Sequence, residues 1–268
     1  MKAYLTTFLK YKYLLHNLIS RDLKVKYRRS TLGLLWSVLN PLLMSIVISI
    51  VFQNFFKFDV PNFAIYYLTG SLIFNFMNEA TSSAMVSIVG NAPLIKKVYI
   101  PKYIFPLEKV MFAFVNMLFS MIALVIMMGV TKLGIIGSAA DLNISWTIVL
   151  FFIPMLYTLV FSLGLGLILA AVNVYFRDVG HLYSVWTMAW MYLTPIIYPM
   201  DIVEGTWVMN VIRLNPMYYF VTYFRDVVTN GTVPGLKTNL LCMGISLLFL
   251  VLGLWVFKKK QDRFILFI

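Results

Sequence analysis

The sequence predicts an all-α integral membrane protein, and three observations support this fold class. Hydrophobic residues make up 61% of the 268 positions and charged residues only 12%, whereas a soluble domain carries about a quarter charged residues. Apolar runs of about 20 residues, long enough to cross the hydrocarbon core as helices, recur along the chain. Lysine and arginine gather around alternate loops, as is typical of the cytoplasmic side. We therefore expect one transmembrane domain over residues 1–268.

Residues 1–33 precede the first apolar run, and we expect them to form an amphipathic helix in the cytoplasmic interface of the membrane. Apolar side chains recur in this segment at helical spacing. They are Tyr4, Phe8, Tyr11, Leu15 and Leu18. Such a helix could serve only as a lipid anchor, or it could also help to form a docking surface for a cytoplasmic partner.

Six apolar runs follow, and we expect each of them to form a transmembrane helix. They cover residues 34–56, 63–89, 107–130, 146–172, 182–198 and 240–257. The six-span bundle thus occupies residues 34–257, and residues 258–268 form a tail. An even number of spans places both ends of the bundle on the same side of the membrane.

The basic residues identify that side as the cytoplasm. Of the 22 lysines and arginines, 17 lie in the N-terminal segment, around the loops after the second and fourth runs, and in the tail. This asymmetry predicts that both termini are cytoplasmic. It also accounts for the net charge of +12 without a nucleic-acid partner.

The segment between the fifth and sixth runs has an unusual composition. Residues 201–238 are too polar to form one span, yet residues 217–224 are rich in aromatic side chains. Apolar groups at this density rarely lie free in water, and irregular backbone at membrane depth needs protein or a water-filled cavity around it. We expect short re-entrant or interfacial helices on the outer side. An ordinary external loop is the alternative.

The sequence contains few groups that could carry catalysis or bind a metal. Cys242 is the only cysteine, His16 and His181 are the only histidines, and the 10 acidic residues are scattered. No phosphate-binding loop of the G-x-x-x-x-G-K-[ST] type occurs. We therefore expect neither a metal site nor an ATP site in this chain. A membrane-embedded transferase or polymerase that acts on lipid-linked sugars is an alternative function.

Glu79 is the one carboxylate placed deep inside an apolar run, close to Asn75 and Asn78. Ionisable groups at such depth are costly and often functional. Glu79 is either a buried carboxyl that bonds to polar neighbours or part of the lining of a substrate path. An ion-coupled transporter of small molecules would depend on it, although a single carboxylate gives little support for such a pump.

Aromatic residues are the most abundant side chains in the runs that could contact a substrate. Tyr183, Trp186 and Trp190 share one face of the fifth run, and Tyr66 and Tyr67 lie near the outer end of the second. Such rings can form belts at the membrane interface. They can also line a path for sugars, because ring faces pack against apolar C–H groups while the polar edges bind hydroxyls.

Two backbone features are expected to shape the bundle. Pro195 and Pro199 should break the fifth run toward its outer end, because proline removes a backbone donor. Gly164, Gly166 and Ala170 in the fourth run should permit the close approach of a neighbouring helix.

Four stretches of the chain resemble the permease subunit of ABC-2 type polysaccharide exporters, the family that moves O-antigen, capsule, teichoic acid and related cell-wall glycans. They are SRDLKVKYRRSTLGLLWSVLNPL at 20–42, SIVGNAPLIKKVYIPKYIFPL at 87–107, NVYFRDVGHLYSVWTMAWMYLTPIIY at 173–198 and NPMYYFVTYFRDVVTNG at 215–231. The resemblance covers most of the chain in the same order.

The resemblance implies a homodimer of this chain together with two copies of a cytoplasmic ATPase subunit, which would bind the ATP and magnesium. The assembly would move a lipid-linked polysaccharide across the bacterial cytoplasmic membrane. This chain would then be a transport subunit with no cofactor of its own, not an enzyme, and membrane lipid would be its other partner.

The resemblance also implies roles for individual residues, since residues 92–101 are similar to the segment that docks on the ATPase. The docking residues expected on this basis are Arg21, Asp22, Lys24, Arg28, Pro93, Lys96, Lys97, Tyr99 and Pro101. The substrate path would be lined by Trp36, Tyr66, Tyr67, Glu79, Tyr183, Trp186 and Trp190. An outer gate would be formed by Pro195, Pro216, Tyr218, Tyr219, Tyr223 and Arg225.

Overall fold

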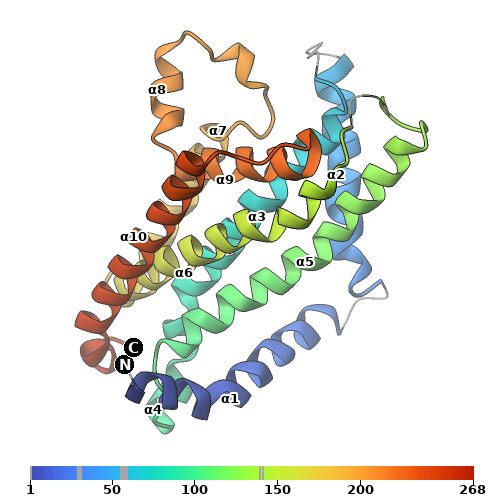
Figure 1. Cartoon of the computed structure of the whole chain (residues 1–268). Coiled ribbons are helices and arrows are strands. Elements are labelled where there is room, and N and C mark those ends of the chain that lie inside the picture. The colour runs from blue at the N-terminus through green and yellow to red at the C-terminus, as the bar shows by residue number, and fades with distance from the viewer. Residues whose placement is uncertain (1, 29–31, 55–59, 139, 141) are drawn as a thin grey trace.

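The computed structural model of the chain describes residues 2–28, 32–54, 60–138, 140 and 142–268, with side chains from residue 10 onward except at position 54. Throughout these ranges the secondary structure is helical, and no strand occurs in them (Figure 1). The all-α prediction is therefore confirmed for the described residues. The long helices pack side by side in the order α10 (Leu236–Lys260), α6 (Phe152–Tyr175), α3 (Phe63–Gly90), α5 (Ile104–Lys132) and α2 (Leu35–Asn54).

Four segments are long and apolar enough to cross a membrane. They are Leu35–Gln53, Ile104–Lys132, Trp146–Tyr175 and Leu236–Leu266. They correspond to the first, third, fourth and sixth predicted runs, although residues 55 and 56 of the first run lie outside the described residues. The Trp146–Tyr175 segment begins as a short 3₁₀ helix, η1 (Trp146–Phe151), and continues as α6.

Helix α3 corresponds to the second predicted run but is less apolar than those four segments. It is 28 residues long and lies in the middle of the bundle, where it contacts α2, α5, α6 and α9 (Pro216–Arg225). Most of its residues are buried against these helices. A helix enclosed in this way meets protein instead of lipid, so it can carry polar side chains that a lipid-facing helix could not.

Helix α7 (Val179–Tyr192) is shorter than the fifth predicted run at residues 182–198. Its 14 residues span about 21 Å, which is less than the hydrocarbon core of about 30 Å. The helix ends because Pro195 disfavours helical backbone at Thr194, and residues 193–198 form turns and bends instead. The predicted break is therefore confirmed, but it comes earlier than the predicted end of the run.

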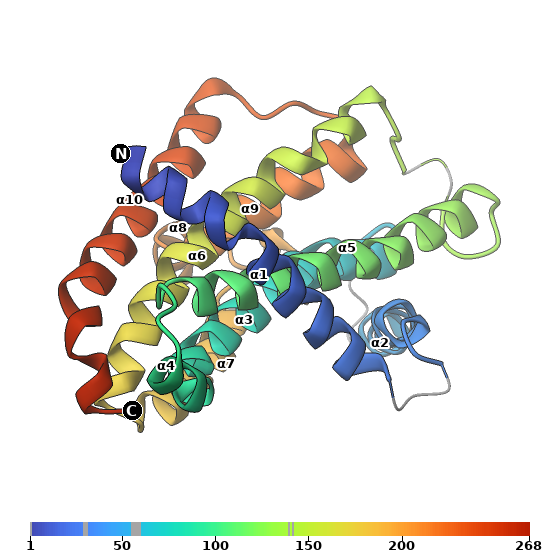
Figure 2. The same cartoon turned by 90° about the horizontal axis from the view of Figure 1, so that it is seen from below.

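Helix α1 (Lys2–Tyr27) crosses beneath the bundle at an oblique angle and packs along α5 (Figure 2). Leu18 is buried, and Tyr11 and Leu15 are partly buried against the end of the bundle at which both termini lie. The predicted apolar face of this segment thus packs on protein over these residues. Tyr4 and Phe8 of the same pattern lie outside the described side chains.

Helix α4 (Ala92–Lys97) is a single short turn between α3 and α5, at the same end of the bundle as both termini (Figure 1). Ile95 anchors it in an apolar cluster that also contains Leu18, Phe105, Phe257 and Phe264. Phe264 belongs to a final 3₁₀ helix, η4 (Gln261–Leu266), whose Gln261 carbonyl accepts a hydrogen bond of 2.6 Å from Lys102 Nζ. One apolar cluster therefore joins α1, α4, α5, α10 and the tail.

The glycines of α6 sit at two close helix contacts. A Cβ atom on Gly164 would collide with the backbone of Phe249 in α10, and one on Gly253 would collide with the backbone of Gly164. A Cβ atom on Gly166 would lie 2.9 Å from Ala84 Cβ in α3. These contacts confirm that the small residues of the fourth predicted run permit close packing.

Residues 201–238 form the short helix α8 (Trp207–Arg213) and the helix α9 beside it, followed by a π-helical turn at Asp226–Asn230. The side chains of Met217, Phe220, Val221 and Phe224 are fully buried, and α9 contacts α3, α6 and α10. The aromatic part of the segment is therefore packed within the bundle, as its composition predicts.

Candidate functional site

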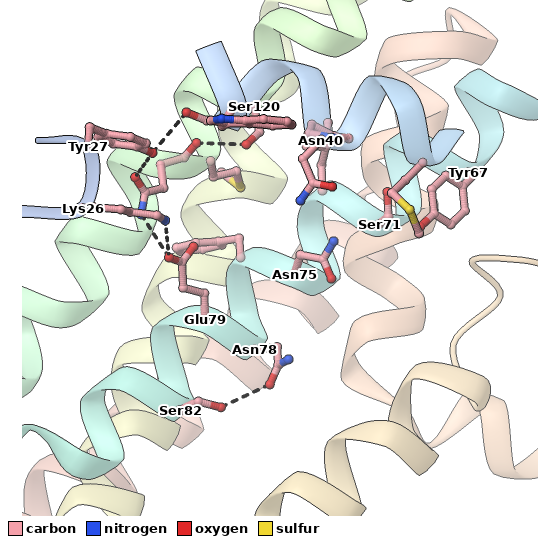
Figure 3. A pocket seen from close by; sticks show the side chains of 18 residues that line it. Lys26, Tyr27, Asn40, Tyr67, Ser71, Asn75, Asn78, Glu79, Ser82 and Ser120 are labelled. Carbon is pink, nitrogen blue, oxygen red and sulfur yellow. Dashed lines mark hydrogen bonds and ion pairs between the residues drawn. The ribbon is translucent and has the colours of Figure 1, made fainter. Parts of the chain in front are cut away.

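A polar groove of about 840 Å³ lies between the end of α1 and helices α2, α3 and α5 (Figure 3). Eighteen residues line it. Four are asparagines, namely Asn40, Asn75, Asn78 and Asn116. Four are serines, namely Ser37, Ser71, Ser82 and Ser120. These amides and hydroxyls can each donate and accept hydrogen bonds.

Helix α3 supplies the floor of the groove through a stripe of polar side chains. Ser71, Asn75, Asn78 and Ser82 follow one another at intervals of three or four residues, so they share one face of the helix. Asn75 is exposed, and Asn78 and Ser82 are half-buried. Figure 3 shows Asn75 and Asn78 pointing into the open space.

Glu79 holds a hydrogen-bonded network at one end of the groove. Its Oε1 atom accepts bonds of 3.0 Å from Lys26 Nζ and 3.0 Å from Asn116 Nδ2. The hydroxyl of Tyr27 donates to Asn116 Oδ1 at 3.1 Å and lies 3.1 Å from the hydroxyl of Ser37. The network therefore ties the end of α1 to α2, α3 and α5. Glu79 therefore has hydrogen-bonding polar neighbours, as expected for a structural carboxyl. It also lines the groove, as expected for a residue of a substrate path.

Two predicted aromatic residues lie in this groove, Trp36 on α2 and Tyr67 on α3. The predicted path thus gathers Trp36, Tyr67 and Glu79 in one place. The sequence reasoning missed Lys26 and most of the asparagines and serines. The repeat of polar residues along the second apolar run could have revealed the α3 stripe.

A second hollow lies on the other flank of the stripe, between α3 and α7. Its lining includes Tyr183 and Thr187 of α7. It also includes Asn75, Asn78 and Ser82, which line the first groove too. Tyr183 is buried, and its hydroxyl is 2.6 Å from Thr81 Oγ1. The α3 stripe is thus shared by two neighbouring hollows.

The other predicted path residues lie elsewhere. Trp186 and Trp190 line an apolar pocket between α6, α7 and α10, and Trp190 Nε1 donates to Asn215 Oδ1 at 2.6 Å. Tyr66 faces the outer turns, where its hydroxyl donates to the carbonyl of Tyr198 at 2.8 Å. The structure therefore does not bring these three residues to the groove.

Arg225 is the centre of a second polar site, at the end of α9. It is only 8% exposed. Its guanidinium donates to the carbonyls of Pro195 at 2.7 Å and Tyr66 at 3.0 Å, and it stacks on the Tyr66 ring with 3.6 Å from Cζ to the ring centroid. A Cβ atom on Gly70 would lie 2.7 Å from Arg225 Nη2, so glycine leaves the space that the guanidinium fills. This outer cluster fastens α9 to α3 and to the turns after α7.

The other predicted gate residues, apart from Pro195, lie along α9. Pro216 opens α9, and the preceding Asn215 caps it by accepting from the backbone N–H of Met217 at 2.9 Å. Tyr223 is buried and donates to Asn239 Oδ1 of α10 at 2.8 Å. Tyr219 donates to the carbonyl of Arg213 at 2.8 Å, and its ring packs on Tyr218.

The predicted docking residues of the 92–101 segment form an exposed surface. Pro93, Lys96 and Lys97 on α4 are exposed, Tyr99 is 91% exposed and Pro101 is half-buried. The buried Ile95 fixes the helix from behind. This surface presents positive charge and an aromatic ring to the space below the bundle.

The predicted docking residues on α1 lie farther along that helix. Arg21 and Asp22 form an ion pair of 2.9 Å, and Asp22 also pairs with Lys109 of α5. Burial raises the pKa of the Asp22 carboxyl, but the hydrogen bonds and charges of Lys109 and Arg21 outweigh it and hold the pKa below its ordinary value. Lys24 and Arg28 are exposed. Helix α1 contacts the 92–101 segment through the apolar cluster and through Tyr11, whose hydroxyl donates to the carbonyl of Tyr99 at 3.4 Å.

Known proteins resemble this chain over most of its length. The family model described as "ABC-2 type transporter" matches residues 13–229. An O-antigen export system permease protein RfbA of Klebsiella pneumoniae is 30% identical over 247 residues, covering 91% of each chain. A protein of the same description from Myxococcus xanthus is 28% identical and covers 95% of each. The capsule polysaccharide export inner-membrane protein CtrC of Neisseria meningitidis serogroup A is 26% identical, covering 96% of this chain and 94% of its own.

Proposed function

This chain belongs to the ABC-2 type transporter membrane family, and on that basis we propose that it is the membrane-spanning subunit of an exporter of lipid-linked polysaccharide. The observation that supports this function best is the polar groove beside α3. Relatives over nearly the whole chain are named as export permeases for O-antigen and capsule polysaccharide. The membrane in question is the bacterial cytoplasmic membrane.

The chemistry of the groove suits a glycan. Its asparagines and serines offer donors and acceptors to sugar hydroxyls, while Trp36 and Tyr67 offer ring faces to the apolar C–H groups of sugars. These contacts are numerous and individually weak. A polymer can exchange one such contact for the next as it moves, which a tight binding site would prevent.

The proposed topology has six spans. Helix α3, and α7 extended by the turns at 193–198, are added to the four segments of sufficient apolarity. The concentration of lysine and arginine places residues 1–33 and 258–268 on the cytoplasmic side. Helix α1 then lies in the cytoplasmic interface, and α8 and α9 enter the outer leaflet without crossing it. The outer cluster around Arg225 would form part of an outer gate.

A homodimer would enclose the substrate path. Helix α2 packs mainly against α3 and α5, and its Leu43, Val47 and Ile50 are exposed. The groove beside α2 is open on one flank. A second copy of the chain, packed against this side, would convert two open grooves into one enclosed path.

A cytoplasmic ATPase subunit would supply the energy and would hold the ATP and magnesium. The exposed surface of α4 and of Tyr99 just after it is its proposed docking site, because Lys96 and Lys97 project from a helix that the buried Ile95 fixes to the bundle. Force applied to α4 would therefore reach α1 and α5 through the apolar cluster that they share.

The test is co-purification and export with the ATPase encoded beside this chain. Deletion of the chain should remove the surface glycan, and the tagged chain should purify with the ATPase. Reversing two charges, Lys96→Glu with Lys97→Glu, should weaken the complex and reduce export. The matched control is Lys258→Glu with Lys259→Glu, which changes exposed lysines of α10 by the same charge.

Two results would contradict the proposal. An intact surface glycan after deletion, together with no ATPase complex, would exclude an export subunit. Formation of a glycan product by the purified chain alone, without ATP, would identify a membrane-embedded transferase or polymerase instead.

A further inference from the structure

The charge of the polar groove is set by only two of the described residues that line it. Lys26 and Glu79 are the charged members of the lining, and they pair with each other at 3.0 Å. The rest of the lining is amide, hydroxyl, aromatic or apolar. The described lining therefore carries no net charge.

This pair is held in place from both sides. Besides Glu79, Lys26 Nζ has the ring of Phe112 at 5.3 Å and that of Tyr27 at 5.8 Å. Glu79 also accepts from Asn116. The two charges come from different elements, since Lys26 ends α1 and Glu79 lies in the middle of α3.

The pair is also accessible to whatever fills the groove. The Lys26 side chain is 41% exposed and the Glu79 side chain 36% exposed. A half-exposed pair of this kind contributes little to stability. Its electric field, however, reaches into the groove, because low-dielectric walls focus the field of the charges between them.

We propose that the Lys26–Glu79 pair sets the charge selectivity of the groove, and that the polymer it accepts is an uncharged polyhydroxylated glycan. This inference rests on the proposed function of the groove as a glycan path. The neutral pair leaves hydrogen bonding and ring stacking as the forces that hold the polymer. If Lys26 loses its charge, Glu79 repels carboxylate-bearing sugars. If Glu79 loses its charge, Lys26 attracts them.

The test compares two soluble probes of equal length and linkage geometry, an α-1,4-linked heptamer of galactose as the neutral glycan and an α-1,4-linked heptamer of galacturonic acid as the acidic one. The full chain is placed in nanodiscs of uncharged lipid at low salt. Saturation-transfer NMR, which detects weak binding, gives the ratio of the two affinities for each variant. An unpaired charge in the groove is expected to change this ratio by about tenfold.

The two single variants should shift the ratio in opposite directions. Lys26→Gln should weaken binding of the acidic heptamer, and Glu79→Gln should strengthen it, with the neutral heptamer changed less than about twofold in both. The double variant Lys26→Gln with Glu79→Gln should return the ratio to that of the wild type. Controls with the same charge changes away from the groove are Lys12→Gln on α1 and Glu204→Gln near α8, and both should leave the ratio unchanged. High salt should reduce the shifts.

The possible failures separate the two claims. If the wild type binds both heptamers but the single variants leave the ratio unchanged, the charge proposal is overturned while the glycan path stands. If the wild type prefers the acidic heptamer, the substrate class is wrong. If neither heptamer binds to the wild type and export of the native glycan is also unaffected by deletion of the chain, the glycan path and the charge proposal fall together.

Discussion

Lys26 and Arg225 are both cations placed among membrane helices, but their surroundings differ in every respect. Lys26 pairs with a carboxylate at the end of an open groove and is 41% exposed on its side chain. Arg225 is buried, stacks on Tyr66 and donates to two backbone carbonyls. The carbonyl oxygens cannot move without moving the backbone of α3 and of the turns after α7.

This difference distinguishes a site that can bind a ligand from a cluster that holds helices and turns together. The Lys26–Glu79 pair can exchange partners with water or ligand, because both side chains reach open space. Arg225 donates to the carbonyls of Tyr66 in α3 and of Pro195 in the turns after α7, so it is a positioning residue for these turns. Four substitutions test this contrast. Their expected effects on the free energy of unfolding decrease from the first to the last.

Replacing Arg225 by Met should lower the free energy of unfolding by about 3 kcal/mol, because buried carbonyl acceptors lose their charged partner. Cys242 is fully buried and is the only cysteine, so the reaction of a thiol-specific dye on heating reports unfolding of the purified chain. Arg213→Met, at an exposed position on α8, is the matched control and should have little effect. An unchanged midpoint for Arg225→Met would show that the cluster fastens nothing.

Gly70→Ala should lower the free energy of unfolding by about 1–3 kcal/mol, because its Cβ atom would lie 2.7 Å from Arg225 Nη2. The same dye assay measures it. Gly244→Ala in α10 is the control, since a Cβ atom there meets nothing within 4 Å and should be neutral or slightly stabilising. Equal behaviour of the two variants would argue against tight packing around the guanidinium.

Glu79→Gln should cost at most about 1 kcal/mol of stability, since the ion pair is half-exposed and the glutamine oxygen can still accept from Asn116. Glu204→Gln, at an exposed position, is the control. A loss as large as that of Arg225→Met would remove the distinction between the two cations.

Asn75→Leu should leave the free energy of unfolding within about 0.5 kcal/mol of the wild type, because the side chain is exposed in the groove. Export of the native glycan should nevertheless fall at least tenfold, to about a tenth or less, since an apolar branch replaces a hydrogen-bonding floor. Asn210→Leu on α8, also exposed, applies the same exchange outside the groove. Normal export by Asn75→Leu would place the path elsewhere.

The sequence pattern predicted the elements well and the site only in part. Apolar runs and their breaks located the long helices, because each helix must match its surroundings over many residues. The end of α7 was wrong by six residues, since the turns at 193–198 are held by contacts with Tyr66, Arg225 and Asn215 from other parts of the chain. Such contacts leave no local pattern.

The site residues were also hard to predict, because their partners lie far away in the sequence. Lys26 is 53 positions from Glu79, and in the sequence it is one of several basic residues that fit a topology signal. Arg225 was predicted for the outer gate, but its partners are backbone carbonyls, which every residue type provides. Trp186 and Trp190 share a helix face with Tyr183 by spacing, yet the packing of α6 and α10 turns that face into an apolar pocket.

Two of the contacts of α1 lie far apart along its length, so this helix links two distant sites. Tyr11 touches the carbonyl of Tyr99 near the proposed ATPase surface, and Lys26 touches Glu79 in the groove. Fifteen residues of helix, about 22 Å, separate these points, and an α-helix of that length resists bending. A tilt applied at Tyr99 would therefore change the distance between Lys26 and Glu79. ATP hydrolysis in the cytoplasm would then change the electric field inside the groove, without any ion having to cross the membrane.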